Sequence, residues 1–417
     1  MEQTMQAEIL TIGDELLIGQ VVDTNSAYLA QRLNALGINL KQITSVHDDR
    51  QHILSAIDEA FSRADIVLTT GGLGPTKDDI TKHVLCEYFH TSLKEDLQVK
   101  QHIFTLYAER PDVLNRLTET QWHVPQDAEI LENRVGSAPI MVFRRKNALN
   151  QWLVSMPGVP YEMQTAMEEQ VEPWLIKHVL PASRSRITHL TALVSGISES
   201  SLALHLEQWE SSLSHDIRLA YLPKDGTIRL RLSGYGVSEE EVRGQFEKMC
   251  LLVGEWLVLK EDISLEEALG NLLKQRGQTI ATAESCTGGR LASLLNARPG
   301  SSAFYMGSVV AYSNEVKQQV LDVSADNLKN YGAVSEQVVR QMAEGVRRLM
   351  HTDYAIATSG IAGPGGGTQE KPVGTVWMAW ATPEKTYAEC FHLGKLRDQI
   401  TARACTKALI RMLQLIR

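Results

Sequence analysis

The chain has 417 residues, a formal net charge of −9 at neutral pH and 43% hydrophobic residues. This length predicts about three domains of about 150 residues each, and the apolar share is ordinary for proteins that bury a core. The acidic balance argues against nucleic acid as a partner. No apolar run approaches the length of a membrane span, so we expect no membrane partner either.

Five cysteines are scattered along the chain without Cys-x-x-Cys spacing: Cys86, Cys250, Cys286, Cys390 and Cys405. An odd number without paired spacing indicates reduced thiols and argues against a disulfide framework or a zinc cluster. Residues 1–5 lack the basic and apolar regions of a signal peptide. We therefore expect a cytoplasmic protein.

Residues 1–172 are predicted to form a first domain of alternating strands and helices. Hydrophobic runs predict strands at Ile9–Ile12, Ile38–Val46 and Ile66–Thr70. Helical periodicity predicts one helix that carries Leu29, Leu33 and Leu36 and stops at Gly37, and another over residues 51–62. This order predicts a mostly parallel sheet covered by helices, in which ligands bind at the carboxyl ends of the strands.

Two polar loops that bear glycines lie at such strand ends, Gly13–Glu15 and Gly71–Thr81. The glycines of the second loop can bring backbone donors to a phosphate, and Asp78 and Asp79 can hold a hard divalent cation. The alternative is that Asp78 or Asp79 simply caps the next helix. No Gly-x-Gly-x-x-Gly fingerprint is present, so NAD is not predicted as a redox cofactor. The candidate ligand-binding residues are Gly13, Asp14, Gly71, Gly72, Gly74 and Thr76.

Residues 173–260 are predicted to form a small α+β unit. Its expected strands and helices are Ile187–Val194, Ser198–Trp209, Ile217–Leu222, Thr227–Ser233 and Glu239–Leu252. Asp225-Gly226 between two alternating runs predicts a hairpin. Four arginines are interpreted as a solvated face rather than an RNA site: Arg184, Arg186, Arg229 and Arg231. A connecting or dimerising role is favoured, and we expect a homodimer.

Residues 261–417 form the last predicted domain, which opens with the capping box Ser264-x-x-Glu267. The strand-like run Thr279–Ala281 leads into Glu284-Ser285-Cys286-Thr287-Gly288-Gly289, and a helix carrying Leu291, Leu294 and Leu295 follows. A nucleophile at a sharp strand-to-helix turn is exposed, and free N–H groups of the helix can stabilise an oxyanion. Acyl transfer requires this arrangement. The alternative is an ordinary tight turn.

Two later segments favour the chemical interpretation. In the first, an apolar strand ends in Tyr312-Ser313-Asn314-Glu315, and Lys317 falls in the first turn of a helix. A lysine acts as a base only if burial or a nearby positive charge lowers its pKa. The second is the glycine-rich Ser359-Gly360-Ile361-Ala362-Gly363-Pro364, which lets backbone N–H groups approach a ligand. It is not a Walker loop, because no Gly-Lys-Ser/Thr follows.

Together these segments resemble the C-terminal domain of the CinA (competence/damage-inducible) family, the nicotinamide mononucleotide deamidases. Gly300-Ser301-Ser302, Lys371–Val376 and Arg397 also match the family pattern over about residues 264–417. The resemblance implies a Ser–Lys hydrolase with Ser285 as nucleophile, Lys317 as base and Tyr312 as an aid to proton transfer. The implied substrate contacts are Thr287, Gly288, Gly289, Ser302, Ser359, Gly360, Gly363 and Arg397.

The implied reaction converts nicotinamide mononucleotide to nicotinate mononucleotide and ammonia in pyridine nucleotide recycling. The pyridinium charge of the substrate makes the carboxamide carbon electrophilic, so no cofactor is expected for deamidation. The N–H groups near Gly288 and Gly289 are the expected oxyanion donors. Cys286 is the rival nucleophile, but no His accompanies it in the matched motifs, so Ser285 is preferred.

The first domain resembles the N-terminal domain of the same family, a relative of the molybdopterin-binding fold. The matches are Gly13–Leu17, Asp23–Asn25, Gly71–Thr76, Asp78–Thr81, Pro157–Pro160 and Glu162-Met163. This resemblance implies an ADP-ribose pyrophosphatase that uses a divalent metal, with or without a monovalent cation, at Asp78 and Asp79. The implied fold is therefore two α/β sheet domains joined by a small α+β KH-like domain, although the Gly-x-x-Gly loop of KH domains is missing at the expected place in this middle segment.

The first domain departs from the family pattern at three positions. Thr120 and Trp122 stand where the family has Lys and Ala, and Ile140 stands where it has Gly. Losing the Lys removes a phosphate partner, and losing the Gly narrows the pocket. A nucleotide- or pterin-binding regulatory protein without turnover is therefore the alternative for this half.

Overall fold

The computed structural model describes residues 5–115, 118–146, 150–180 and 187–417. Arg184 and Arg186, and all but one of the residues inspected for a signal peptide, lie outside the described residues. The chain forms two compact units, Met1–Thr188 with Gly234–Glu241 and His189–Ser233 with Val242–Arg417. The three-domain boundaries expected at 1–172, 173–260 and 261–417 stay a prediction.

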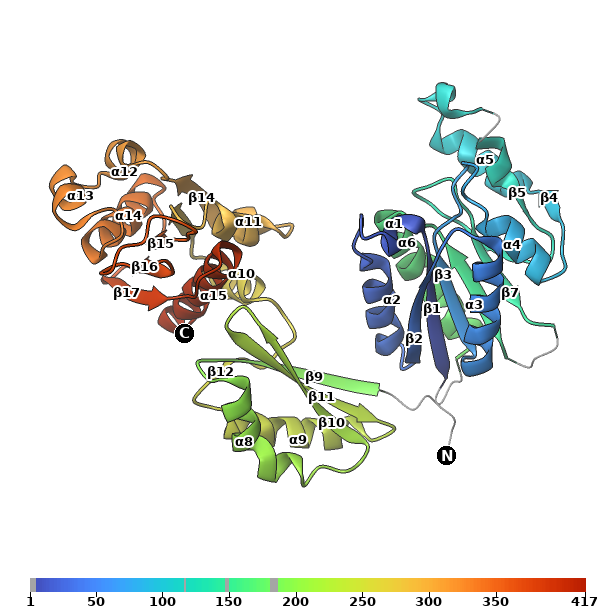
Figure 1. Cartoon of the computed structure of the whole chain (residues 1–417), viewed down its shortest axis with the longest axis horizontal. Coiled ribbons are helices and arrows are strands. Elements are labelled where there is room, and N and C mark those ends of the chain that lie inside the picture. The colour runs from blue at the N-terminus through green and yellow to red at the C-terminus, as the bar shows by residue number, and fades with distance from the viewer. Residues whose placement is uncertain (1–4, 116–117, 147–149, 181–186) are drawn as a thin grey trace. The chain divides into compact units, whose positions relative to one another are not determined.

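A six-stranded sheet organises the first unit, with the strand order β2-β1-β3-β8-β7-β6 (Figure 1). The pairs from β2 to β8 are parallel, whereas β7 and β6 are antiparallel. The mostly parallel sheet expected from the sequence is confirmed. Its strands are β1 (Gln6–Ile12), β2 (Asn39–Val46), β3 (Ile66–Thr70), β6 (Glu129–Leu131), β7 (Ile140–Arg144) and β8 (Trp152–Met156). A small antiparallel pair is added by β4 (Leu93–Glu95) and β5 (His123–Pro125).

Helices cover both faces of this sheet because successive side chains of a strand point to opposite sides. Ala7 and Ile9 of β1 belong to one core, and Leu10 and Ile12 belong to another. The first core includes α2 (Thr24–Ala35), α6 (Pro160–Ala166), the π-helical Met167–Val171 and α7 (Glu172–His178). The second includes α3 (Arg50–Arg63) and α4 (Thr81–Tyr88). The remaining helices are α1 (Asp14–Leu17), α5 (Leu97–Leu106) and the 3-10 turns Pro111–Val113 and Thr118–Trp122.

A four-stranded sheet follows, in the order β10-β11-β9-β12. Asp225 and Gly226 have φ values of 48° and 84°, so the predicted Asp-Gly hairpin turn is confirmed between β10 and β11. The elements are β9 (Ile187–Ser195), α8 (Glu199–Glu210), β10 (Ile217–Lys224), β11 (Thr227–Tyr235), α9 (Glu239–Leu252) and β12 (Leu257–Leu259).

A five-stranded sheet in the order β14-β13-β15-β16-β17 carries the last third of the chain. The strand β13 runs parallel to both β14 and β15, whereas β16 and β17 are antiparallel. The strands are β13 (Ile280–Glu284), β14 (Tyr305–Val310), β15 (Tyr354–Gly360), β16 (Thr375–Ala381) and β17 (Thr386–His392). The helices are α10 (Leu265–Arg276), α11 (Arg290–Asn296), α12 (Asn314–Leu321), α13 (Ala325–Tyr331), α14 (Glu336–Leu349) and α15 (Arg397–Ile416), with a 3-10 turn at Ser301–Ala303, η4.

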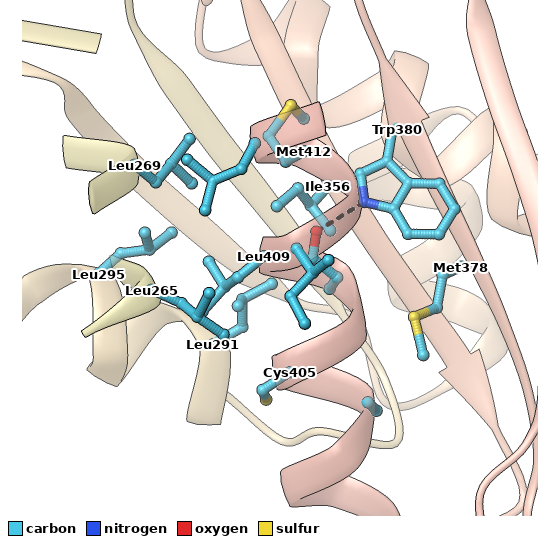
Figure 2. Packing of buried hydrophobic residues seen from close by; sticks show 14 of the residues in the cluster. Leu265, Leu269, Leu291, Leu295, Ile356, Met378, Trp380, Cys405, Leu409 and Met412 are labelled. Carbon is cyan, nitrogen blue, oxygen red and sulfur yellow. Dashed lines mark hydrogen bonds between the residues drawn. The ribbon is translucent and has the colours of Figure 1, made fainter. Parts of the chain in front are cut away.

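Two hydrophobic cores pack against this sheet, one on each face. Figure 2 shows the first, in which leucines of α10, α11 and α15 pack against β15 and β16. There the indole N–H of Trp380 donates to the carbonyl of Ala408 at 2.8 Å. The second core lies under α14. The strand β13 contributes Ile280 to the first core and Ala281 and Ala283 to the second, so its carboxyl end is held rigidly.

None of the helices among the described residues combines the length and the apolarity that a membrane span needs.

Candidate active site

Ser285 follows the carboxyl end of β13, an inner strand of the sheet that pairs with β14 and β15. Its backbone N–H donates to the carbonyl of Thr358 in β15 at 3.0 Å, so the residue still pairs with the sheet. The chain then turns through Gly288 and Gly289, whose φ values of 60° and 92° favour glycine, and α11 begins at Arg290. The strand–turn–helix placement expected for Ser285 is confirmed.

The side chain of Lys317 meets Ser285 although the two residues lie 32 positions apart. Lys317 lies on α12, is 1% exposed, and its Nζ lies 3.3 Å from Ser285 Oγ. The same amine donates to the carbonyls of Ala311 at 2.8 Å and Tyr312 at 3.2 Å. Burial lowers the pKa of Lys317, and the nearby Cys286 opposes this effect. The structure thus joins a serine hydroxyl to a desolvated amine.

The hydrogen bonds of Lys317 fit both protonation states of its amine. An ammonium has three N–H donors, which the two carbonyls and Ser285 Oγ accept. A neutral amine keeps two N–H donors for the carbonyls and directs its lone pair at Ser285 Oγ. The pair can therefore exchange a proton without losing a buried hydrogen bond.

Cys286 lies inside the protein rather than at the surface. Its side chain is 6% exposed, and burial raises the pKa of its thiol to about 12. The thiolate is the nucleophilic form of cysteine, so a thiol with this pKa is almost wholly unreactive at neutral pH. This observation supports Ser285 over Cys286 as the nucleophile.

Several predicted substrate contacts gather around the ends of β13 and β15. The hydroxyls of Thr287 and Thr358 share a buried hydrogen bond of 2.7 Å. Ser359 Oγ donates to the carbonyl of Ala333 at 2.7 Å. Arg397, which begins α15, donates to the carbonyl of Gly363 at 2.9 Å and so anchors the glycine-rich loop. Gly360 packs so closely on Val376 that a Cβ has no room.

Two predicted site residues do not meet the Ser–Lys pair through their side chains. The Tyr312 side chain is 69% exposed, and Lys317 bonds only to its backbone carbonyl. Ser302 is exposed on the short turn η4. Among the described residues, none of the hydrogen bonds of Ser285 or Lys317 reaches either of these two hydroxyls.

Glu284, the residue before Ser285, was not predicted from the sequence as a site residue. Its fully buried carboxylate accepts hydrogen bonds from the N–H groups of Gly289, Leu291 and Ala292. The N–H of Gly288 donates to the carbonyl of Ser285 at 3.2 Å. The expectation that the N–H groups near Gly288 and Gly289 hold an oxyanion is therefore corrected, because both groups are already used.

A cavity of about 430 Å³ lies at the carboxyl ends of β1 and β3 in the first unit. It is lined by the predicted residues Gly13, Gly71, Gly72, Gly74, Asp78 and Asp79, among others. Asp14 lies next to the cavity and contacts His47 at 2.8 Å. Thr76 donates its backbone N–H to Asp79 at 2.9 Å. The loops after β1 and β3 therefore line the same cavity, as the sequence predicted for a shared ligand site.

The helix-capping alternative for Asp78 and Asp79 is wrong. The N-cap residue, which precedes α4, is Ile80, and no side chain caps this helix. The Asp79 carboxylate instead accepts from both the N–H and the hydroxyl of Thr76 within its own loop. A short polar side chain that bonds its own turn in this way competes with capping.

Asp48 is a second site residue that was not predicted from the sequence. It follows β2, lines the cavity, and accepts from the Asp14 N–H at 3.2 Å. Burial raises the pKa of Asp48, and the charges of Asp14, Glu15 and Asp79 raise it further. Within the described ranges, no three His, Cys, Asp or Glu side chains are arranged to hold a metal ion. Asp78 and Asp79 as metal ligands thus stay a prediction.

Three known protein domains match successive segments of the chain. Residues 8–177 match the probable molybdopterin binding domain, residues 191–257 the damage-inducible protein CinA KH domain, and residues 262–416 the CinA C-terminal domain. The chain is 43% identical over 413 residues to a CinA-like protein of Flavobacterium psychrophilum, covering 97% of each. The chain belongs to the CinA family.

Other CinA proteins are similar over different lengths. A CinA-like protein of Cytophaga hutchinsonii is 41% identical over 421 residues, covering 99% of each chain. The crystal structure of competence damage-inducible protein A from Klebsiella pneumoniae is 40% identical, covering 36% of this chain and 93% of that one, with a TM-score of 0.35. The resemblance and the predicted fold class are confirmed: a molybdopterin-binding-like domain, a KH-like middle domain and a CinA C-terminal domain.

The departures from the CinA pattern fall outside the lining of the 430 Å³ cavity. Trp122 and Ile140 are buried and do not line it, so the expected narrowing is absent from this cavity. Lys82 is buried beside them and donates to the carbonyl of Thr120. Burial lowers the pKa of Lys82 to about 8. The neighbouring Gln121 amide is also buried, and within the described residues it has no hydrogen-bond partner.

Proposed function

We propose that this CinA protein is an amidohydrolase whose C-terminal domain converts nicotinamide mononucleotide to nicotinate mononucleotide and ammonia. The observation that carries the proposal is the 3.3 Å contact between Lys317 Nζ and Ser285 Oγ at a buried position. A serine becomes nucleophilic when an adjacent base removes its proton. The identity of the substrate comes from the family resemblance.

The proposed reaction has two halves, each using the same pair. Neutral Lys317 takes the proton of the Ser285 hydroxyl as Oγ bonds to the carboxamide carbon. The C–N bond then breaks, the leaving nitrogen takes a proton from Lys317, and ammonia departs from an ester on Ser285. Water next gives a proton to Lys317 and attacks the ester carbon. The C–Oγ bond breaks, Ser285 recovers its proton, and the acid is released.

A cationic substrate ring would favour the neutral, basic form of Lys317. A pyridinium close to Lys317 further disfavours the ammonium form, which adds to the effect of burial on the pKa. We assign the substrate phosphate to the loop held by Arg397 and Gly363, whose backbone is anchored at 2.9 Å. Tyr312, whose backbone carbonyl accepts from Lys317 Nζ, is proposed to help carry the proton from Lys317 to the leaving nitrogen. No cofactor enters these steps.

Ammonia release tests the proposal directly. The purified chain is incubated with nicotinamide mononucleotide, ammonia is measured by a coupled enzymatic assay, and nicotinate mononucleotide is measured by chromatography. Equal amounts of both products are expected from the wild type, and neither from Ser285→Ala. A wild type that forms neither product would show that the proposed reaction is wrong.

The second proposal is that the N-terminal cavity binds ADP-ribose or a related diphosphate. The supporting observation is the pair Gly71 and Gly72, which line the cavity with positive φ at the end of β3. Metal-dependent hydrolysis stays a prediction. Among the described residues, Asp78 and Asp79 are not joined by a third side chain of a type that binds metal, so the diphosphate itself would have to supply further ligands. Calorimetric titration with ADP-ribose measures binding, and AMP formation with Mg²⁺ measures turnover. Binding without AMP would favour a nucleotide- or pterin-binding regulatory role.

A further inference from the structure

Glu284 has one of the most enclosed carboxylates in the chain. It has no exposed surface, and its two oxygens face the start of α11. One oxygen accepts from the N–H groups of Gly289 at 3.1 Å and Leu291 at 3.0 Å, and the other accepts from Ala292 at 2.7 Å. These are N–H groups that the helix itself cannot satisfy, and the negative charge is favoured at this helix end.

The backbone of Glu284 connects to the base through one intermediate residue. The carbonyl of Glu284 accepts from the N–H of Ala311 at 2.8 Å. The carbonyl of Ala311 in turn accepts from Lys317 Nζ at 2.8 Å. Ser285 is bonded covalently to Glu284. One residue therefore ties together the nucleophile, the start of α11 and the loop that holds the base.

We infer that Glu284 is a positioning residue that sets the distance between Ser285 and Lys317, and that it occupies the helix donors in place of an oxyanion. The inference rests on the proposed function only for its activity assay, since the geometry concerns the Ser–Lys pair itself. Glu284 touches neither substrate nor proton. It acts by fixing the turn that carries Ser285 Oγ.

The charge of Glu284 matters as much as its size. A carboxylate accepts hydrogen bonds at both oxygens, whereas a glutamine amide has one oxygen and one NH₂ donor. In Glu284→Gln, the side-chain NH₂ replaces one carboxylate oxygen and faces at least one of the three backbone N–H groups. At least one hydrogen bond to the start of α11 is therefore lost, and two N–H donors point at each other. The turn must shift to relieve this contact. A misplacement of about 1 Å costs on the order of 100-fold in rate.

Glu284→Gln is compared with Glu8→Gln as a matched control. Glu8 is equally buried and pairs with Arg63 at 2.6 Å, but lies in the other compact unit. Two readouts are measured: kcat and KM for ammonia release, and the rate at which a fluorophosphonate labels Ser285. We expect Glu284→Gln to lower kcat and the labelling rate about 100-fold with KM changed less than about threefold. Glu8→Gln is expected to lower only the unfolding temperature of the first unit.

The labelling rate separates this inference from the proposed function. If the wild type releases no ammonia but labels at Ser285, and Glu284→Gln slows labelling, the substrate is wrong and the inference stands. Wild-type labelling and kcat in folded Glu284→Gln would overturn it. If that variant fails to fold, Glu284→Asp keeps the charge but withdraws it by one methylene, and a labelling rate at least about tenfold lower is expected. A wild-type rate in Glu284→Asp would likewise overturn the inference.

Discussion

The two candidate sites of this chain are assembled by the fold to different degrees. At the C-terminal site, the proposed nucleophile Ser285 and the proposed base Lys317 are already within hydrogen-bond distance, and Lys317 is buried. At the N-terminal cavity, Asp78 is exposed and the Asp79 carboxylate is engaged by Thr76. Covalent catalysis needs its protein groups aligned before the substrate arrives. A site for a diphosphate can instead be completed by its ligand, so the contrast predicts different sensitivities to substitution and to chelation.

The largest expected effect is that of Ser285→Ala. Removing the nucleophile of a catalytic unit should lower ammonia release by several orders of magnitude, on the order of 10⁴-fold or more. Ser285 is only half-buried, so circular dichroism and the unfolding temperature should stay close to those of the wild type. ADP-ribose binding should also be unchanged. An active Ser285→Ala together with an inactive Cys286→Ala would reverse the assignment of the nucleophile.

Lys317→Arg tests whether the second group acts as a base. A guanidinium keeps the charge but does not lose its proton near neutrality. The variant should be nearly as inactive as Lys317→Ala, with a loss of about 10²–10⁴-fold in kcat. Steady-state ammonia release by both variants decides the question. Substantial turnover by Lys317→Arg would make Lys317 a charge contact and remove the general-base step.

The pH dependence of the wild type follows from the same lysine. Its native pKa lies below the ordinary value of 10.5 because the amine is buried. Turnover should therefore rise with pH through this lowered pKa, as the neutral base accumulates. Between the lowered pKa and 10.5 the unfolded chain binds the extra proton, so the free energy of unfolding should also rise with pH in that window. A rate that falls across this window would contradict the role of Lys317 as base.

Chelation sharpens the comparison between the two sites. EDTA should stop any hydrolysis of ADP-ribose, because Asp78 and Asp79 are the carboxylates predicted to hold the cation. Deamidation should change by less than about twofold, since the Ser–Lys mechanism needs no metal. The two products, AMP and ammonia, are measured from the same preparation. If EDTA abolishes deamidation and an added divalent cation restores it, the metal-free mechanism is excluded.

Among the substitutions at the C-terminal site, the smallest expected effect is that of Cys286→Ala. The thiol is buried and its pKa is raised to about 12, so it contributes almost no thiolate at neutral pH. Its loss should change kcat by less than about threefold, because the substitution removes only packing and a thiol contact with Thr358. A parallel unfolding measurement reports that packing loss. A Cys286→Ala variant whose activity falls as far as that of Ser285→Ala would contradict this ranking.

Local features of the fold were predictable because neighbouring residues determine them. Gly37 ends α2 with a φ of 75°, and the turn at Asp225-Gly226 needs two left-handed residues. Ser264, predicted to open a capping box, caps α10 by accepting the N–H of Glu267. In each case the residue type and the required backbone conformation lie within a few positions, so no tertiary information is needed.

The site was only partly predictable, since its contacts join distant segments. No periodicity relates Ser285 to Lys317, and their pairing followed from the family resemblance alone. The role of Glu284 depends on which way the last residue of β13 points, which the sequence does not state. Asp48 was overlooked because the sequence does not show that the loop after β2 faces the same cavity as Gly13 and Gly71. The capping alternative for Asp79 failed because bonding within its own loop prevailed over helix capping.

The anchor that Arg397 provides for the glycine-rich loop has a consequence for synthesis. Ser285 leaves the ribosome more than a hundred residues before α15, whose leucines and Met412 complete the core under β13. At ordinary elongation rates this interval lasts on the order of ten seconds. Ser285 and the glycine-rich loop are therefore synthesised before the helix that anchors the loop, so the core that packs on α15 is completed only near the end of synthesis.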